Sequence, residues 1–219
     1  QTFDVPIYGI SLRNGLPGVK HALEIIAKEH DCQLFISADI GSDTFFTGEE
    51  TQVCSPLIDA FSVICASEMS IPGVYALNGY GGDAGMHIAH LNRNVGECMR
   101  RGGFLGASGL TQKDVLDLQK IFDIIGPDDV EQWPQRAAKG ELGVFYCKRL
   151  WGVERIPAAA VTFFFDPDVV CAMNPAIQAC MDTKTLQEAE DAIWSQCGIL
   201  SETRLAMDLP YPPQVPYQP

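Results

Sequence analysis

The sequence predicts an α/β protein with a three-layer, Rossmann-like fold, in which helices cover both faces of a mostly parallel sheet. Segments that favour strands alternate with segments that favour helices, and the expected strands are apolar throughout rather than on one side only. Hydrophobic residues make up 47% of the 219 residues, which is enough for a sizeable core. We therefore expect a single α/β domain over residues 1–207.

The first half of the chain contains three expected strands, which are short, apolar and bounded by glycine or proline: 5–12, 33–40 and 73–77. A helix is expected over 19–30, where apolar residues recur at helical spacing. A second helix begins at Ser55-Pro56, because serine caps helices and proline suits the first turn. Between them, residues 41–50 form a loop rich in glycine, threonine and acidic residues.

The second half is expected to contain further helices over 86–100, 111–125, 128–139 and 185–197, and strands over 142–151 and 158–165. The helix at 111 starts with a capping box, Thr111 to Asp114. Residues 102–109 are rich in glycine and are expected to break the chain between elements. Residues 208–219 contain five prolines and are expected to form an extended C-terminal arm.

The charge balance excludes several kinds of partner. Lysine and arginine number 15 against 28 acidic residues, so the net charge is −13. Such a surface repels nucleic acid and anionic lipid, and no apolar run approaches the length of a membrane helix. The eight cysteines include no CxxC pair, and this usage favours free thiols in a reducing compartment. We expect a cytoplasmic protein that binds neither nucleic acid nor membrane.

Aspartates follow three of the expected strands. Asp39 ends the second strand, with Asp43 in the loop behind it, Asp83 follows the third strand, and Asp166 and Asp168 follow the last. Ligands of α/β sheets bind beyond the carboxyl ends of the strands. Converging carboxylates there can hold Mg²⁺ or transfer protons, but aspartates at such positions also cap helices and start turns.

The loop from Asn78 to Gly85 contains the pattern G-x-G-x-x-A between a strand and a helix. Its glycines would let backbone amides approach an anionic group, and the alternative is a tight turn with no ligand. Asp83, His87 and His90 follow at helical spacing, so they form a second possible metal set.

The segment 36–50 and the segment 54–60 resemble the signature of domain-of-unknown-function family eleven fifty-two. That signature is D-x-G-G-D-x-x-x-x-G-x-E followed by S-P-L-x-D-A, and the loop from Gly79 resembles the family's glycine-rich loop. The resemblance implies a Rossmann-like fold and, together with the strand-end argument, a ligand-binding set consisting of Gly41, Ser42, Gly48, Glu50, Ser55, Asp59, Gly79, Gly81 and Gly82.

Two departures from the family pattern concern the expected site. Ser42 stands in place of the second glycine, and no glutamate follows Asp83-x-Gly. The family also begins with a glycine-rich strand-turn-helix half, which this chain lacks, and the chain does not start with Met. We expect a companion chain, produced by processing or encoded separately, that completes the sheet and the site in a hetero-oligomer.

These observations favour an enzyme that acts on a small anionic metabolite. Asp39, Asp43 and Asp83 are the expected catalytic or Mg²⁺-binding residues, with His87 and His90 as further metal candidates. Hydrolase, lyase or cyclase, and ligase chemistry all remain open. The alternative is a non-catalytic α/β subunit that binds a ligand or supports a larger assembly.

Overall fold

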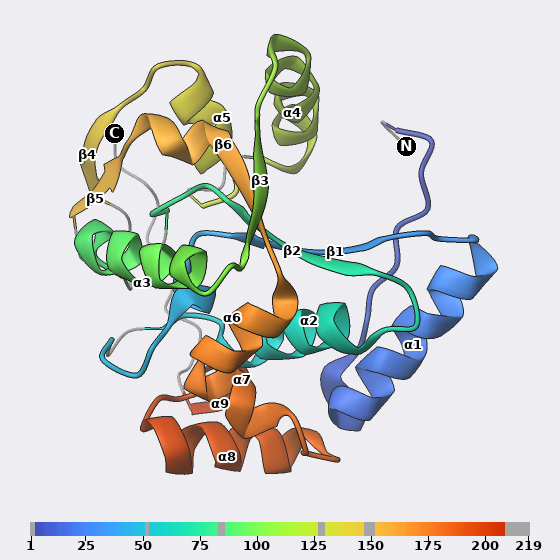
Figure 1. Cartoon of the computed structure of the whole chain (residues 1–219). Helices are drawn as coiled ribbons and strands as arrows, with labels where there is room; N and C mark the ends of the chain where they lie inside the picture. Colours follow the sequence, from blue (N-terminus) through green and yellow to red (C-terminus); the bar gives the residue numbers. More distant parts are fainter. Residues whose placement is uncertain (1–2, 51–52, 83–85, 127–129, 147–151, 209–219) are drawn as a thin grey trace.

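The computed structural model (Figure 1) describes residues 3–50, 53–82, 86–126, 130–146 and 152–208. Its strands are β1 (Phe35–Ile40), β2 (Gly73–Asn78), β3 (Phe104–Gly109), β4 (Gly143–Tyr146), β5 (Gly152–Arg155) and β6 (Val161–Phe165). Its helices are α1 (Gly15–Glu29), α2 (Pro56–Glu68), α3 (Ile88–Arg100), α4 (Gln112–Ile125), α5 (Trp133–Ala138), α6 (Pro167–Met173), α7 (Pro175–Cys180), α8 (Leu186–Cys197) and α9 (Glu202–Asp208). Short 3₁₀ turns are η1 (Leu12–Asn14), η2 (Asp43–Phe45) and η3 (Pro157–Ala160).

The main sheet is mixed, with the described strands in the order β1-β2-β6-β3. β1 and β2 are parallel, whereas β6 is antiparallel to both of its neighbours, so β1, β2 and β3 run in one direction and β6 runs back between them. The sheet is therefore mixed, and the prediction of a mostly parallel sheet was wrong. That prediction relied on the apolar character of the strands, but β2 and β6 are central strands, and a central strand is apolar whichever way it runs.

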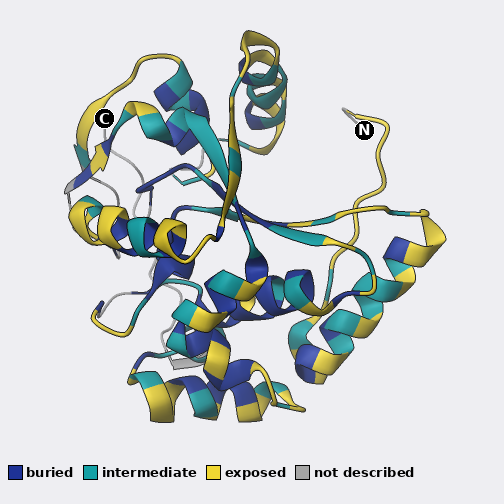
Figure 2. Ribbon diagram, viewed as in Figure 1, coloured by how far each residue is buried: buried dark blue, intermediate teal, exposed yellow. Residues whose placement is uncertain are grey.

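Helix α2 is the centre of the core and packs on β1 and β2, while α6, α7 and α8 gather on the same side (Figure 1). Figure 2 shows the buried residues concentrated in α2 and in the middle of the sheet. The α2 face expected from the sequence, made of Leu57, Phe61, Ile64 and Cys65, is fully buried, and so are Ala60 and Val63. This packing fixes the position of the start of α2 against the carboxyl end of β1.

The opposite side of the sheet is only partly covered. Helices α4 and α5 and the β4–β5 hairpin lie on that side in Figure 1. Over β1, however, Ile36 is 48% exposed and Ala38 is also exposed, next to the half-buried Val74 and Phe164. The register places these four residues on one face, which we call the open sheet face. Helices on both faces, as expected from the sequence, are not found there among the described elements.

Several local expectations are also corrected. The expected strand over 5–12 is not formed: residues 5–11 are extended without regular structure, because no described strand lies beside them to complete a hydrogen-bonded ladder. The expected break at 102–109 contains β3, whose small residues are tolerated because it is an edge strand. The expected strand over 142–151 is β4, and β5 pairs with it as a hairpin; residues 147–151 lie outside the described residues.

Three helices near the C-terminal end were not expected. Asp166 and Asn174 cap α6 and α7, and a proline follows each cap at the first helical position. The aspartate pair after the last strand therefore serves a helix start, which is the structural alternative to a functional role. The expected helix over 128–139 is shortened to α5 among the described residues, and the proline-rich arm from 209 onward lies outside them.

The described cysteines, which exclude Cys147, are free thiols. Burial raises the pKa of Cys65, Cys171 and Cys180 to about 12, so these thiols stay protonated. Within the part of the chain that the structure describes, no helix combines the length and apolar character needed to cross a membrane.

Candidate functional site

Asp39 lies next to the last residue of β1, on the face of the sheet that packs against α2. Its Oδ2 atom accepts hydrogen bonds from the Tyr75 hydroxyl at 2.9 Å and from Thr44 Oγ1 at 2.8 Å. Tyr75 lies on the neighbouring strand β2, and Thr44 lies in η2, directly beyond the end of β1. Two neutral donors from two elements thus hold this carboxyl group in place.

Asp43 begins η2 and is 1% exposed. Its Oδ2 atom accepts the backbone N–H groups of Cys54 at 2.7 Å and Ser55 at 3.1 Å, immediately before α2. A carboxylate suits this position because the start of a helix has unpaired N–H groups and a partial positive charge. Asp43 therefore ties the loop after β1 to the start of α2.

Asp59 lies in the first turn of α2 and accepts a hydrogen bond from Ser55 Oγ at 3.1 Å. One oxygen atom from each of Asp39, Asp43 and Asp59 lies within 4.8 Å of the other two. We call these residues the carboxylate cluster. Three elements, β1, η2 and α2, each contribute one member, and the cluster lies at the carboxyl edge of β1 where the sequence predicted a site.

The cluster has an electrostatic cost. Burial and, to a smaller extent, the neighbouring Asp43 carboxylate raise the pKa of Asp39 to about 6, although the hydrogen bonds from Thr44 and Tyr75 lower it. Desolvation and like charge both oppose ionisation of a carboxyl group. At neutral pH the cluster therefore concentrates negative charge that a proton or a cation would relieve.

The other expected ligand-binding residues of the loop after β1 shape that loop. Glu50 is buried, and its carboxylate accepts hydrogen bonds from Thr47 N at 2.9 Å and from Asn94 Nδ2 of α3 at 2.8 Å. Burial opposes ionisation of Glu50, but these hydrogen bonds together outweigh it and lower the pKa. Gly41 has φ 141°, a conformation that favours glycine, where its N–H bonds Asn78 O at 2.9 Å. Ser42 is fully buried beside Asp43, and Gly48 has φ 94°.

The described part of the glycine loop, residues 79–82, packs against helices α5 and α3. Gly82 N donates to Gly79 O at 2.8 Å, so the loop is a tight turn. A Cβ on Gly82 would lie 3.0 Å from the Trp133 ring, and one on Gly79 would lie 3.2 Å from Ile40 and 3.3 Å from Pro134. Close packing against α5 accounts for Gly79 and Gly82, whereas Gly81 packs against α3, because its Cβ would lie 2.9 Å from Ile88.

The second metal set is only partly described. Asp83 lies outside the described residues. His87 caps α3, with its Nδ1 accepting the N–H of Ala89 at 3.2 Å, and its ring contacts that of His90 with centroids 6.3 Å apart. The described part of the chain brings neither histidine into the carboxylate cluster.

A shallow cavity of about 440 Å³ lies at the other end of β2, where that strand begins. Its lining includes Ser67, Gly73, Asp166 and Asp168, but Ser67 donates a hydrogen bond to Asp168 and Asp166 caps α6. Its polar groups thus have structural partners, and the chemistry of the cluster lies at the opposite strand end.

Sequence reasoning missed three residues that shape the site. Thr44 and Tyr75 hold Asp39, and Glu202 of α9 accepts the N–H groups of Leu57 at 3.2 Å and Ile58 at 2.7 Å. A tyrosine within an apolar strand was one available signal for a polar partner. Nothing local marked Glu202, because it is 144 residues from Ile58 along the chain.

The fold and the cluster define an acidic mixed α/β protein with a carboxylate site at the carboxyl edge of its sheet. The model of the DUF1152 family, described as proteins of unknown function, matches residues 1–209, and the chain belongs to that family. Comparison with curated proteins and with solved structures gave no match.

Proposed function

We propose that this chain is an enzyme that acts on a small anionic metabolite with the help of Mg²⁺ bound at the carboxylate cluster. The observation that carries the proposal is the approach of three carboxylate oxygens, from three elements, to within 4.8 Å of one another. Magnesium prefers carboxylate oxygens at about 2.0–2.1 Å, and oxygens this close can share one ion. A bound cation would also relieve the repulsion between Asp39 and Asp43.

The surrounding residues support this chemistry. Backbone N–H groups orient Asp43 and the Ser55 hydroxyl orients Asp59, as outer partners commonly orient metal ligands. Bound Mg²⁺ would supply positive charge for the anionic group of a substrate. The alternative role of Asp39, without a bound ion, is proton transfer, because its pKa of about 6 lies in the range useful for general acid–base catalysis. Hydrolase, lyase or cyclase, and ligase reactions all suit these roles.

Direct measurement of cation binding tests the proposal. We expect the full chain to bind Mn²⁺, a spectroscopic substitute for Mg²⁺, at one site, and Asp43→Asn to abolish that binding. Glu49→Gln is the matched control, because Glu49 belongs to the same loop but is exposed and pairs with Arg93 at 2.7 Å. Electron paramagnetic resonance measures the bound Mn²⁺. Equal binding by the wild type and by Asp43→Asn would refute a site at the cluster.

A non-catalytic α/β subunit is the second candidate, and the capping bonds favour it. Asp43 and Glu202 accept the N–H groups at the start of α2, a role that needs no ligand. Under this alternative, Asp43→Asn lowers the free energy of unfolding and no cation binds to the wild type. The Mn²⁺ titration therefore separates the two candidates.

We also propose that a companion polypeptide covers the open sheet face, which would complete a three-layer, Rossmann-like fold within a hetero-oligomer. The exposure of Ile36 and Ala38 supports this, because sheets in α/β proteins normally pack helices on both faces. Native mass spectrometry of protein from its own source should detect a second polypeptide, and a chain without one would contradict the companion.

We also propose a reducing compartment such as the cytoplasm, which the free thiols support.

A further inference from the structure

Glu202 links the C-terminal end of the described chain to the carboxylate cluster. It is the first residue of α9, and its two carboxylate oxygens accept the N–H groups of Leu57 and Ile58. Both donors lie in the first turn of α2, the turn that also carries Asp59. A residue remote in sequence thus contacts the helix start from which one member of the cluster projects.

The backbone donors at the start of α2 are shared between two carboxylates. Asp43 accepts the N–H groups of residues 54 and 55, Pro56 has none, and Glu202 accepts those of residues 57 and 58. The first N–H bonded within the helix is that of Asp59, which donates to Ser55 O at 3.1 Å. The orientation of this turn, and hence of Asp59 relative to Asp43, is therefore set jointly by Asp43 and Glu202.

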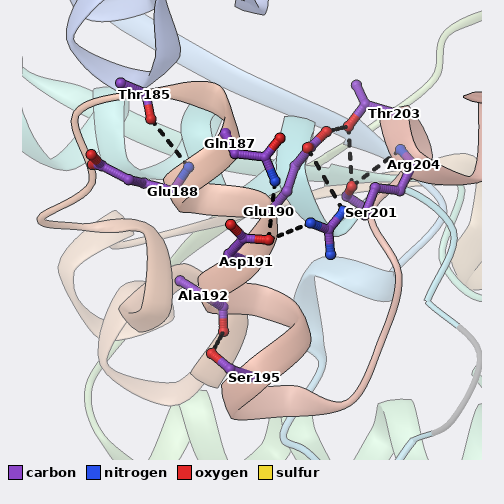
Figure 3. A network of polar contacts seen from close by, with 10 residues as sticks. All are labelled: Thr185, Gln187, Glu188, Glu190, Asp191, Ala192, Ser195, Ser201, Thr203 and Arg204. Carbon is purple, nitrogen blue, oxygen red and sulfur yellow. Dashed lines mark hydrogen bonds and ion pairs between the residues drawn. The ribbon is translucent and has the colours of Figure 1, made fainter.

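A polar network connects the start of α9 to α8 (Figure 3). Thr203 donates a hydrogen bond to Glu190 and shares one with Ser201 at 3.0 Å, and Arg204 forms an ion pair with Asp191. The residues that follow Glu202 are thereby tied to Glu190 and Asp191 of α8, and Ser201 before it is linked to them through Thr203. The Glu202 carboxylate between them bonds α2 instead, so α8 supports the residue that contacts the start of α2.

Glu202 also adds negative charge near the cluster. Burial raises its pKa, and the charge of Asp43 raises it further, which indicates that the two carboxylates are close enough to repel. A cation at the cluster would attract Glu202 as well as its direct ligands. Positioning and charge therefore act in the same direction on cation affinity.

We propose that Glu202 is a positioning residue for the carboxylate cluster, and that α9 controls cation affinity by holding the first turn of α2. This inference rests on the proposed Mg²⁺ site. It assigns the C-terminal helix a role in the site although Glu202 is not itself a member of the cluster.

The test is Mn²⁺ affinity of the folded full chain with Glu202→Ala and Glu202→Gln. We expect Glu202→Ala to weaken binding roughly 10–100-fold, as outer partners of metal ligands do, and Glu202→Gln to weaken it less, because glutamine can still accept one N–H group. Glu188→Gln is the matched control, since Glu188 caps the neighbouring helix α8 through Lys184 N at 2.7 Å and loses the same charge.

Circular dichroism and thermal melting establish that each variant is folded at the titration temperature. If Glu202→Ala fails to fold, Arg204→Ala, which loosens α9 and keeps the Glu202 carboxylate, is expected to weaken Mn²⁺ binding as well. If the wild type binds Mn²⁺ and the folded Glu202 or Arg204 variants bind it with the same affinity, the positioning role is overturned and the proposed site is not. Absence of Mn²⁺ binding in the wild type would overturn this inference together with the proposed function.

Discussion

At the scale of single residues, the cluster depends on the environment of Asp39. The side chain is buried beside the Asp43 carboxylate, so its charged form is less stable than in water even though Thr44 and Tyr75 donate hydrogen bonds to it. An uncharged residue at this position would make the folded state more stable. A carboxyl group at such a position is typical of sites that bind cations or transfer protons.

Asp39 predicts a dependence of stability on pH. Its pKa is about 6 in the folded chain against 3.8 without the fold, so between these values the folded state binds more protons and stability falls as pH rises. The difference corresponds to a cost on the order of 3 kcal/mol at neutral pH. We expect Asp39→Asn to be nearly neutral at pH 4 and stabilising at pH 7, measured by urea unfolding in EDTA.

The same measurement with added Mg²⁺ has a different expected result. A bound cation would favour ionised Asp39, so the wild type should gain stability and Asp39→Asn should lose its advantage. Asp123→Asn, at an exposed residue of α4, serves as a control for the loss of one negative charge. An Asp39→Asn effect that is the same at pH 4 and pH 7 would contradict the raised pKa.

At the scale of elements, short helices are held by caps that reach into the site. Asn174 accepts the N–H groups of Ala176 and Ile177 at the start of α7, and its Nδ2 donates to Thr44 O at 2.9 Å. Since Thr44 also bonds Asp39, this cap connects α7 to the carboxylate cluster.

Two caps of different burial give a prediction at this scale. Asn174→Ala removes three hydrogen bonds of a buried side chain, so we expect it to lower the free energy of unfolding by about 2–3 kcal/mol. Thr185→Ala, at the exposed cap of α8, should cost about 1 kcal/mol or less. Urea unfolding measures both, and equal costs would show that burial and the bond to Thr44 add nothing.

Element by element, the sequence predicted what depends on local pattern. The α2 face, the start of α2 at Pro56, the capping box of α4 and the approach of Asp39 to Asp43 follow from spacing and strand-end rules, but the Ser55 hydroxyl donates to Asp59 instead of capping the helix. The direction of β6 and the pairing of β3 do not, because they depend on how residues 110–160 return the chain to the sheet. Glu202 and Tyr75 reach the site through tertiary packing and left little mark on local pattern.

At the scale of the whole molecule, charge and apolar surface are unevenly distributed. The chain carries a net charge of −13, yet the open sheet face presents the exposed Ile36 and Ala38 beside the half-buried Val74 and Phe164, with the buried Ala76 between Ala38 and Phe164. Uncharged apolar surface on an acidic protein is typical of a surface that another polypeptide covers. The carboxylate cluster faces α2, on the other side of the sheet, so a partner could dock there without blocking it.

The open sheet face predicts that the isolated chain associates with itself when its partner is absent. We expect Ile36→Lys to reduce this association and to change the free energy of unfolding by about 0.5 kcal/mol or less, because the side chain is already 48% exposed. Ile25→Lys, at a 51% exposed residue of α1, is the matched control and should leave association unchanged. Sedimentation velocity over a range of concentrations measures both, and equal association of the two variants would place the adhesive surface elsewhere. Cation binding at the cluster should be unaltered by Ile36→Lys, since that side chain projects from the opposite face of β1 to Asp39.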